Sequence, residues 1–175
     1  MENSIYLDAS RCAGCGACAV ACMDQNDIYP EKGQPAFRRI YRVEEGTSPE
    51  ASILYVSASC MHCADSPCVI GCPTGSIARD GKTGAVLVDT SMCIGCHSCA
   101  MACPFGVPRY DLEDKMQKCT LCIERVQAGL RPACVRVCPT GALKFEPINE
   151  VLGEKEARLA STVISAAYRT REIIR

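Results

Sequence analysis

Apolar residues in this chain gather in short runs that are typical of strands. Runs at 76–79 and 85–89 predict a tight β-hairpin, because Asp80-Gly81 and Thr83-Gly84 supply the left-handed positions that such a turn needs. Runs at 37–43 and 53–56 predict a second hairpin, which a polar loop at 44–50 joins. No apolar stretch approaches the length of a membrane span.

Two segments carry a helical pattern. Residues 123–128 predict a short helix that ends at Gly129, with Pro132 beyond it. The tail at 154–175 predicts an amphipathic helix, with Leu159, Val163, Ala166, Ala167 and Ile174 near one face. A single helix of this kind needs a surface to pack on, which is either the rest of the chain or another subunit.

Cysteine usage changes the picture most. The chain has 16 cysteines among 175 residues, and they form four quartets with none left over. The quartets are Cys12, Cys15, Cys18 and Cys22; Cys60, Cys63, Cys68 and Cys72; Cys93, Cys96, Cys99 and Cys103; and Cys119, Cys122, Cys134 and Cys138. All but the first end in Cys-Pro.

This spacing predicts iron–sulfur clusters. Three closely spaced thiolates and a remote fourth, usually followed by proline, are how bacterial ferredoxins hold cubane clusters. Zinc also binds four cysteines, but zinc ribbons place two pairs a dozen or more residues apart. Disulfides need an oxidising compartment, and residues 1–12 contain no apolar signal segment. We therefore expect four [4Fe–4S] clusters, with a structural zinc protein as the alternative that metal analysis separates.

The composition fits a chain that is organised around such cofactors. Only 5% of the residues are aromatic and none is tryptophan, so we expect the cluster-free chain to be largely unfolded. The formal charge is −1, and four oxidised clusters would bring it to roughly −9, so that lysine and arginine act partly as counter-charges. No basic run is dense enough to indicate nucleic-acid binding.

Internal repetition predicts an α+β fold of two nested bacterial ferredoxin-like units. Quartets two and three flank the hairpin at 76–89, which leaves quartets one and four to form the other unit around them. The predicted domains are 1–30 with 119–146, a hairpin insertion at 31–59, an inner unit at 60–118 and a C-terminal helical tail at 147–175. We expect the hairpin insertion to lie outside the cluster core, as either a lid over a cluster or a docking surface.

Nesting also predicts the ligand sets, because the fourth cysteine of each quartet in a two-cluster ferredoxin binds the other cluster. Set A is Cys12, Cys15, Cys18 and Cys138; set B is Cys22, Cys119, Cys122 and Cys134; set C is Cys60, Cys63, Cys68 and Cys103; set D is Cys72, Cys93, Cys96 and Cys99. Spacing alone leaves open a sequential alternative, in which quartet one pairs with two and quartet three with four.

Nothing in the sequence indicates a catalytic site. A fully ligated cubane has no open position for substrate, and the glycines at 14 and 16 suit tight wrapping rather than phosphate binding. His62 and His97 lie between cluster cysteines, where we expect a loop or tuning role rather than ligation. The chemistry is therefore that of a non-catalytic relay of single electrons.

The chain resembles the four-cluster electron-transfer subunits of molybdenum and tungsten pterin oxidoreductases, the dimethyl sulfoxide reductase B-subunit family. The likeness covers residues 5–150 and includes Phe37-Arg38-Arg39-Ile40-Tyr41, Cys60-Met61-His62-Cys63, Cys93-Ile94-Gly95-Cys96, the segment from Met101 to Tyr110, and Arg131-Pro132-Ala133-Cys134. In this family the quartets pair in the nested order, and the first quartet usually lacks the following proline.

The resemblance implies a large molybdenum- or tungsten-pterin catalytic subunit as partner, of reductase, formate dehydrogenase or aldehyde oxidoreductase type, in anaerobic metabolism. The amphipathic tail and the end of the chain at Arg175 favour further copies of the chain, in a filament, or a third redox subunit over a membrane anchor. The alternatives are a free polyferredoxin, which would purify as a monomer, and a hydrogenase-linked relay. We expect a cytoplasmic protein, exported only if a partner carries the signal.

Overall fold

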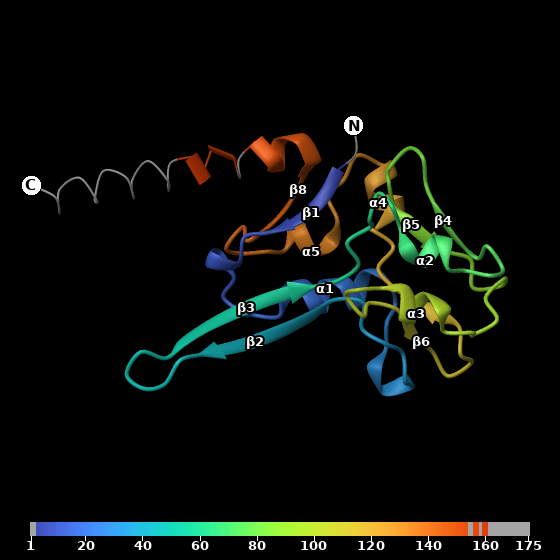
Figure 1. Ribbon diagram of the computed structural model, residues 1–175, viewed down its shortest axis with the longest axis horizontal. Helices are drawn as coiled ribbons and strands as arrows, with labels where there is room; N and C mark the ends of the chain where they lie inside the picture. Colours follow the sequence, from blue (N-terminus) through green and yellow to red (C-terminus); the bar gives the residue numbers. More distant parts are fainter. Residues whose placement is uncertain (1–2, 154–155, 158, 161–175) are drawn as a thin grey trace, which may run out of the picture.

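The computed structural model describes residues 3–153, 156–157 and 159–160 of the chain (Figure 1). Its strands are β1 (Asn3–Leu7), β2 (Arg39–Glu45), β3 (Ser52–Ala58), β4 (Ile77–Arg79), β5 (Val86–Val88), β6 (Arg109–Tyr110), β7 (Met116–Gln117) and β8 (Leu143–Pro147). Its helices are α1 (Ala17–Gln25), α2 (Pro67–Ile70), α3 (Ser98–Ala102), α4 (Ile123–Gln127) and α5 (Ala133–Arg136), with 3-10 turns at Ala9–Arg11 and Pro30–Lys32. The fold is a small α+β fold with short helices.

The strands form four separate antiparallel pairs, β1 with β8, β2 with β3, β4 with β5 and β6 with β7. The β1–β8 pair joins the two ends of the described chain, with Leu7 opposite Leu143 and Asn3 opposite Pro147. An isolated two-stranded pair is only marginally stable in water. The fold therefore depends on what lies between the pairs.

Elements from the two ends of the sequence lie together on one side of the molecule. There α1 packs against α5, and α5 against β8. The middle of the chain forms the other side, where α2 packs against α3 and β4. In Figure 1, β1, β8 and α5 accordingly lie in the left half, and α2, α3, β4 and β5 lie in the right half.

Each side has a small buried cluster that includes cysteines. On the first side, Val135 and Leu143 pack with Cys18 and Cys134. On the other, Ile77, Val86 and Met116 pack with Cys93 and Cys99. The hydrophobic core is thus built directly on the thiol-bearing residues.

The predicted hairpins are confirmed. In the turn between β4 and β5, the Asp80 carboxylate accepts hydrogen bonds from the Thr83 N–H at 2.7 Å and its hydroxyl at 2.6 Å, and Gly84 has φ +73°. The helix predicted at 123–128 is also confirmed, as α4, and Gly129 follows it at φ +73°.

The predicted tail helix at 154–175 falls mostly outside the described residues. Positions 154–155, 158 and 161–175 are not described, whereas 156–157 and 159–160 are helical. No helix within the described part of the chain is both long and apolar enough to cross a membrane.

Candidate metal centres

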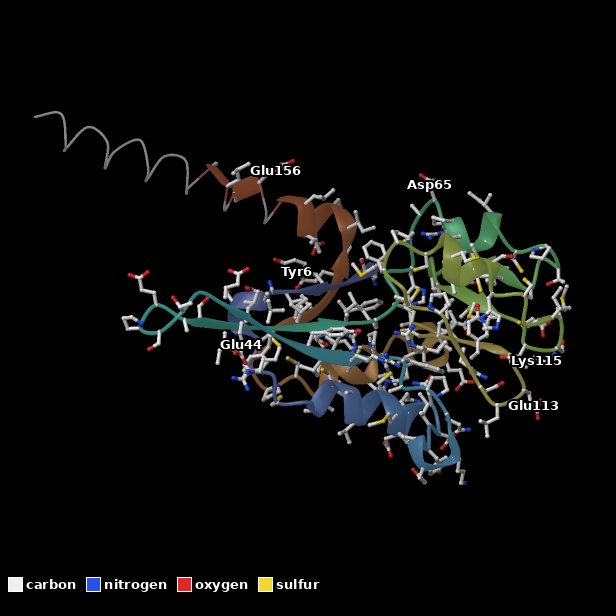
Figure 2. All side chains as sticks on the ribbon, turned by 60° about the horizontal axis from the view of Figure 1, so that its bottom comes forward. Tyr6, Glu44, Asp65, Glu113, Lys115 and Glu156 are labelled. Atoms are coloured by element: carbon white, nitrogen blue, oxygen red, sulfur yellow. The ribbon has the colours of Figure 1, made fainter. Side chains whose placement is uncertain are left out.

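The sixteen cysteines all lie within the described residues, and none of them forms a disulfide. Figure 2 shows sulfur atoms in both halves of the molecule. Two cavities are each lined by four cysteines that come from two different quartets.

The first group lines a cavity of about 330 Å³. Cys12 and Cys15 lie in the loop before α1, Cys18 in the first turn of α1, and Cys138 just after α5. Leu7, Ile40 and Leu143 are among the apolar residues that complete the wall. The structure therefore brings quartet one together with the last cysteine of quartet four.

The second group lines a cavity of about 290 Å³. Cys93, Cys96 and Cys99 surround it from the loop before α3 and from α3 itself, and Cys72 reaches it from the end of α2. Ile77, Met116 and Tyr110 are among the residues that close it. Here quartet three meets the last cysteine of quartet two.

The remaining cysteines are close enough to influence one another's ionisation. Burial raises the pKa of Cys22 to about 12, and nearby thiolates at Cys119, Cys134 and Cys122 contribute to the increase. Burial likewise raises the pKa of Cys63 and of Cys68, and for both of them Cys60 and Cys103 add to the increase. Cys22 is thus near Cys119, Cys122 and Cys134, while Cys63 and Cys68 are each near Cys60 and Cys103.

The donor set fits a polynuclear cluster. Among the described residues, no three Cys, His, Asp or Glu side chains converge as a single metal ion requires. In the two lined cavities, four thiols instead surround an apolar space of about 290 or 330 Å³. Four thiolates around an apolar space are what a cubane cluster needs.

Hydrogen bonds favour the thiolate form of two cysteines that precede proline. Burial alone would raise the pKa of Cys72, but hydrogen bonds from Ser76 and Thr74 outweigh it and lower the pKa to about 6. The pKa of Cys138 is set by the same balance. Burial raises it, but hydrogen bonds from the Leu143 backbone and from Thr140 lower it by more, so the pKa is lowered overall. Deprotonated sulfur is the form that binds metal.

Comparison with known proteins decides the family. Two family models, both described as 4Fe-4S dicluster domains, match residues 51–148 and 11–77. The B subunit of the anaerobic dimethyl sulfoxide reductase of Escherichia coli (strain K12) is 42% identical over 169 residues, which is 91% of this chain and 80% of that protein. The chain belongs to this family of dicluster iron–sulfur subunits.

Other relatives have related names. The thiosulfate reductase electron transfer subunit PhsB of Salmonella typhi is 41% identical over 95% of this chain and 91% of its own length. The iron-sulfur subunit of the nitrate-inducible formate dehydrogenase of Escherichia coli (strain K12) is 39% identical, over 91% of this chain and 59% of its own length. Two dicluster domains imply four [4Fe–4S] clusters, and the 16 cysteines of the chain provide four ligands for each of them.

The two histidines of the iron–sulfur subunit occupy different environments. His62 is buried, and its Nδ1 accepts a hydrogen bond from the Val86 N–H at 2.9 Å. Burial, followed by the charges of Lys118 and Arg38, lowers its pKa to about 3, so the ring is neutral. His97 stacks on Tyr110 with ring centroids 3.8 Å apart. The Tyr110 hydroxyl lies 3.1 Å from Cys99 Sγ, so His97 supports a side chain that touches a candidate ligand.

The base of the hairpin of β2 and β3 borders the cysteine core. The sequence left open whether this hairpin is a lid over a cluster or a docking surface. Ile40 and Ser57, at its base, line the cavity of Cys12, Cys15, Cys18 and Cys138. The Tyr55 ring lies against Gly14, where an added Cβ would be only 2.4 Å from the ring. Its base borders this cavity, while its tip extends away from the body (Figure 1).

Several side chains that contact the cysteines were not predicted. Ser57, Ser76, Thr74, Thr140 and Tyr110 each place a hydroxyl within 3.1–3.7 Å of a cysteine sulfur. One signal for two of them was present: the sequence Cys-Pro-Thr-Gly occurs at 72–75 and again at 138–141. The others come from positions distant in sequence or from ordinary loop residues.

The repeated Cys-Pro-Thr-Gly turn allows a matched test of hydrogen bonding. It is followed by Ser76 in one copy, whose hydroxyl lies 3.2 Å from Cys72 Sγ, and by Ala142 in the other. Because a donor to a ligand sulfur stabilises the reduced cluster, Ser76→Ala should lower one midpoint potential, and Ala142→Ser should raise another. We expect shifts on the order of 50 mV, close to a tenfold change in the reduction equilibrium.

Potentiometric titration followed by electron paramagnetic resonance would measure these shifts, with iron content as the control for cluster loading. Unchanged midpoints in both fully loaded variants would contradict the prediction.

Proposed function

We propose that this chain is the non-catalytic electron-transfer subunit of a molybdenum- or tungsten-pterin oxidoreductase. It would pass single electrons between a large catalytic subunit and an outside carrier or further subunits. The observation that carries the proposal is the extensive similarity to relatives that are named as subunits of reductases and dehydrogenases. When bound, [4Fe–4S] clusters supply reversible one-electron transfer, and the protein supplies their spacing and surroundings.

We also propose that the clusters are held by sets A to D in the nested order. The cavity of Cys12, Cys15, Cys18 and Cys138 supports set A, and the cavity of Cys72, Cys93, Cys96 and Cys99 supports set D. The mutual effects on pKa at Cys22, and at Cys63 and Cys68, support sets B and C. The β1–β8 pair, which joins the ends of the chain around the middle elements, supports two nested units.

Contacts between sets support the linear order A, B, C, D. Cys18 of set A and Cys134 of set B belong to one buried cluster. Cys119 of set B is buried, and burial raises its pKa. A backbone hydrogen bond and Arg38 lower this pKa, and the nearby Cys60 of set C raises it. Cys68 of set C and Cys72 of set D pack against the same core. Each neighbouring pair of sets is therefore in close proximity, as a relay requires.

Anaerobic purification of the tagged chain from its native host would test this function. We expect about sixteen irons per chain, beyond those of any partner, and molybdenum or tungsten in a large co-purifying subunit. Sixteen irons in an isolated monomer would instead favour a free polyferredoxin-type carrier. Zinc in place of iron would overturn the cofactor assignment as well.

A further inference from the structure

Arg38 is a buried positive charge at the base of the β2–β3 hairpin. Its side chain is 2% exposed. Its Nη1 donates to the Ser57 hydroxyl at 2.9 Å, and its Nη2 donates to the Ser59 hydroxyl at 2.7 Å. Within the described part of the chain, no carboxylate forms an ion pair with it. A buried guanidinium without a carboxylate is costly unless another negative group compensates it.

The hydrogen bonds of Arg38 lead to a cluster ligand. The Ser57 hydroxyl oxygen lies 3.3 Å from Cys18 Sγ. A guanidinium only donates, so the Ser57 oxygen must accept from Arg38 and keeps its own proton for another partner. A metal-bound thiolate only accepts. Arg38 thereby orients the Ser57 O–H toward Cys18.

The Ser57–Cys18 contact also lies beside a second set. Cys18 of set A and Cys134 of set B belong to the same buried cluster. Arg38 therefore lies where it can compensate the negative charge of two neighbouring clusters.

We propose that Arg38 tunes two clusters at once: it positions the Ser57 hydrogen bond to Cys18 of set A, and its charge favours the reduced states of sets A and B. Reduction adds one negative charge to a cluster, so a nearby fixed cation raises the midpoint potential. The proposal rests on the ligand sets given above, but not on the identity of the catalytic partner.

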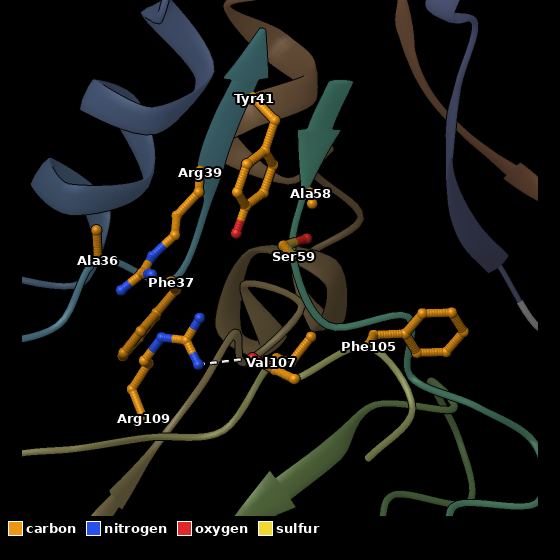
Figure 3. Close-up of a pocket in the computed structure, with 10 residues that line it drawn as sticks. Ala36, Phe37, Arg39, Tyr41, Ala58, Ser59, Phe105, Val107 and Arg109 are labelled. Atoms are coloured by element: carbon orange, nitrogen blue, oxygen red, sulfur yellow. Dashed lines mark hydrogen bonds between the residues drawn. The ribbon is translucent and has the colours of Figure 1, made fainter. Parts of the chain in front are cut away.

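Arg39 provides a matched control one position along the chain. Successive side chains in a strand point to opposite faces. Arg39 accordingly is exposed, in a surface depression of about 280 Å³ that Tyr41, Phe105 and Arg109 also line (Figure 3). No cysteine lines this depression. Removing the Arg39 charge therefore changes the net charge equally without changing a contact to the sets.

The experiment compares Arg38→Gln, Ser57→Ala, their double variant and Arg39→Gln in the purified, cluster-loaded protein. Iron content reports loading, and redox-poised electron paramagnetic resonance reports the four midpoint potentials. We expect Arg38→Gln to lower two midpoints, each by a tenfold or larger change in the reduction equilibrium, which is about 59 mV for one electron. Ser57→Ala should lower only one of these two, and Arg39→Gln should leave all four near their original values.

The double variant separates positioning from charge. If Arg38 acts on set A partly through Ser57, the two substitutions are less than additive at the midpoint that both affect. The proposal is overturned if Arg38→Gln shifts no more than Arg39→Gln, if all four midpoints move together, or if Ser57→Ala moves none.

If Arg38→Gln loses iron, Arg38→Lys shows whether keeping the positive charge keeps the clusters. Ser57→Ala must in that case still lower one midpoint potential. The potentials belong to this chain alone, so they test the inference even if the partner is not a molybdenum or tungsten enzyme.

Discussion

Removal of the iron–sulfur clusters is expected to abolish the cooperative folding of this chain. The four strand pairs are each two-stranded, and the largest fully buried side chains are only Met116, Val86 and Pro132. Both buried clusters include cysteines, so the remaining apolar contacts are few. Without a bound cofactor, the four thiols of a set repel one another when ionised and leave a void when neutral.

Chelation of iron under denaturing conditions, followed by refolding without iron or sulfide, would produce the cluster-free chain. Circular dichroism and urea titration should then show little fixed structure and no cooperative transition. Anaerobic reconstitution with iron and sulfide should restore both. A sharp unfolding transition in the iron-free protein would show that the polypeptide folds without its cofactors.

Replacement of crossed ligands is expected to have the second largest effect, the loss of one whole cluster. In the nested scheme, Cys22 and Cys134 bind the same cluster, although they lie in different quartets. Cys22→Ala and Cys134→Ala should each reduce the iron content by about four, and so should the two together. Cys22→Ala combined with Cys12→Ala should instead remove about eight irons, because set A and set B are then both damaged.

The sequential alternative differs for the Cys22 and Cys134 double variant, whereas the Cys22 and Cys12 double variant loses two clusters in either scheme. If quartet one paired with quartet two, Cys22 would share a cluster with Cys60, and Cys22→Ala with Cys134→Ala would remove two clusters. Sulfide and iron are measured on protein of verified mass, so that a variant that fails to fold is recognised by loss of all four clusters rather than one or two.

The sequence predicted the parts of this protein that depend on local patterns. The quartets, the two hairpins and the helix at 123–128 each show in the spacing of a few neighbouring residues. By contrast, β1 and β8 were not predicted as partners, because Leu7 and Leu143 meet only through tertiary pairing. Helix α1 was missed because its turns carry Cys18 and Cys22, whose spacing was interpreted as ligand chemistry alone.

The same limit applies to the surroundings of the cysteines. A serine such as Ser57 has nothing in its own neighbourhood to distinguish it, and its role depends on Cys18, which α1 brings to the base of the hairpin. Arg38 belongs to a motif on which the family resemblance rests. In the structure Arg38 is buried and Arg39 is exposed. A strand pattern alone does not say which of two adjacent arginines faces inward.

The pairing of the first strand with the last also has a consequence for synthesis on the ribosome. Strands β4 to β7 pair among themselves within residues 77–117, whereas β1 has no partner until β8, at Leu143–Pro147, has been translated. The cavity that Cys12, Cys15 and Cys18 line is likewise incomplete until Cys138 has been translated. During that interval its thiols are open to oxidation, so chaperoned or delayed cluster insertion would benefit the amino-terminal half most.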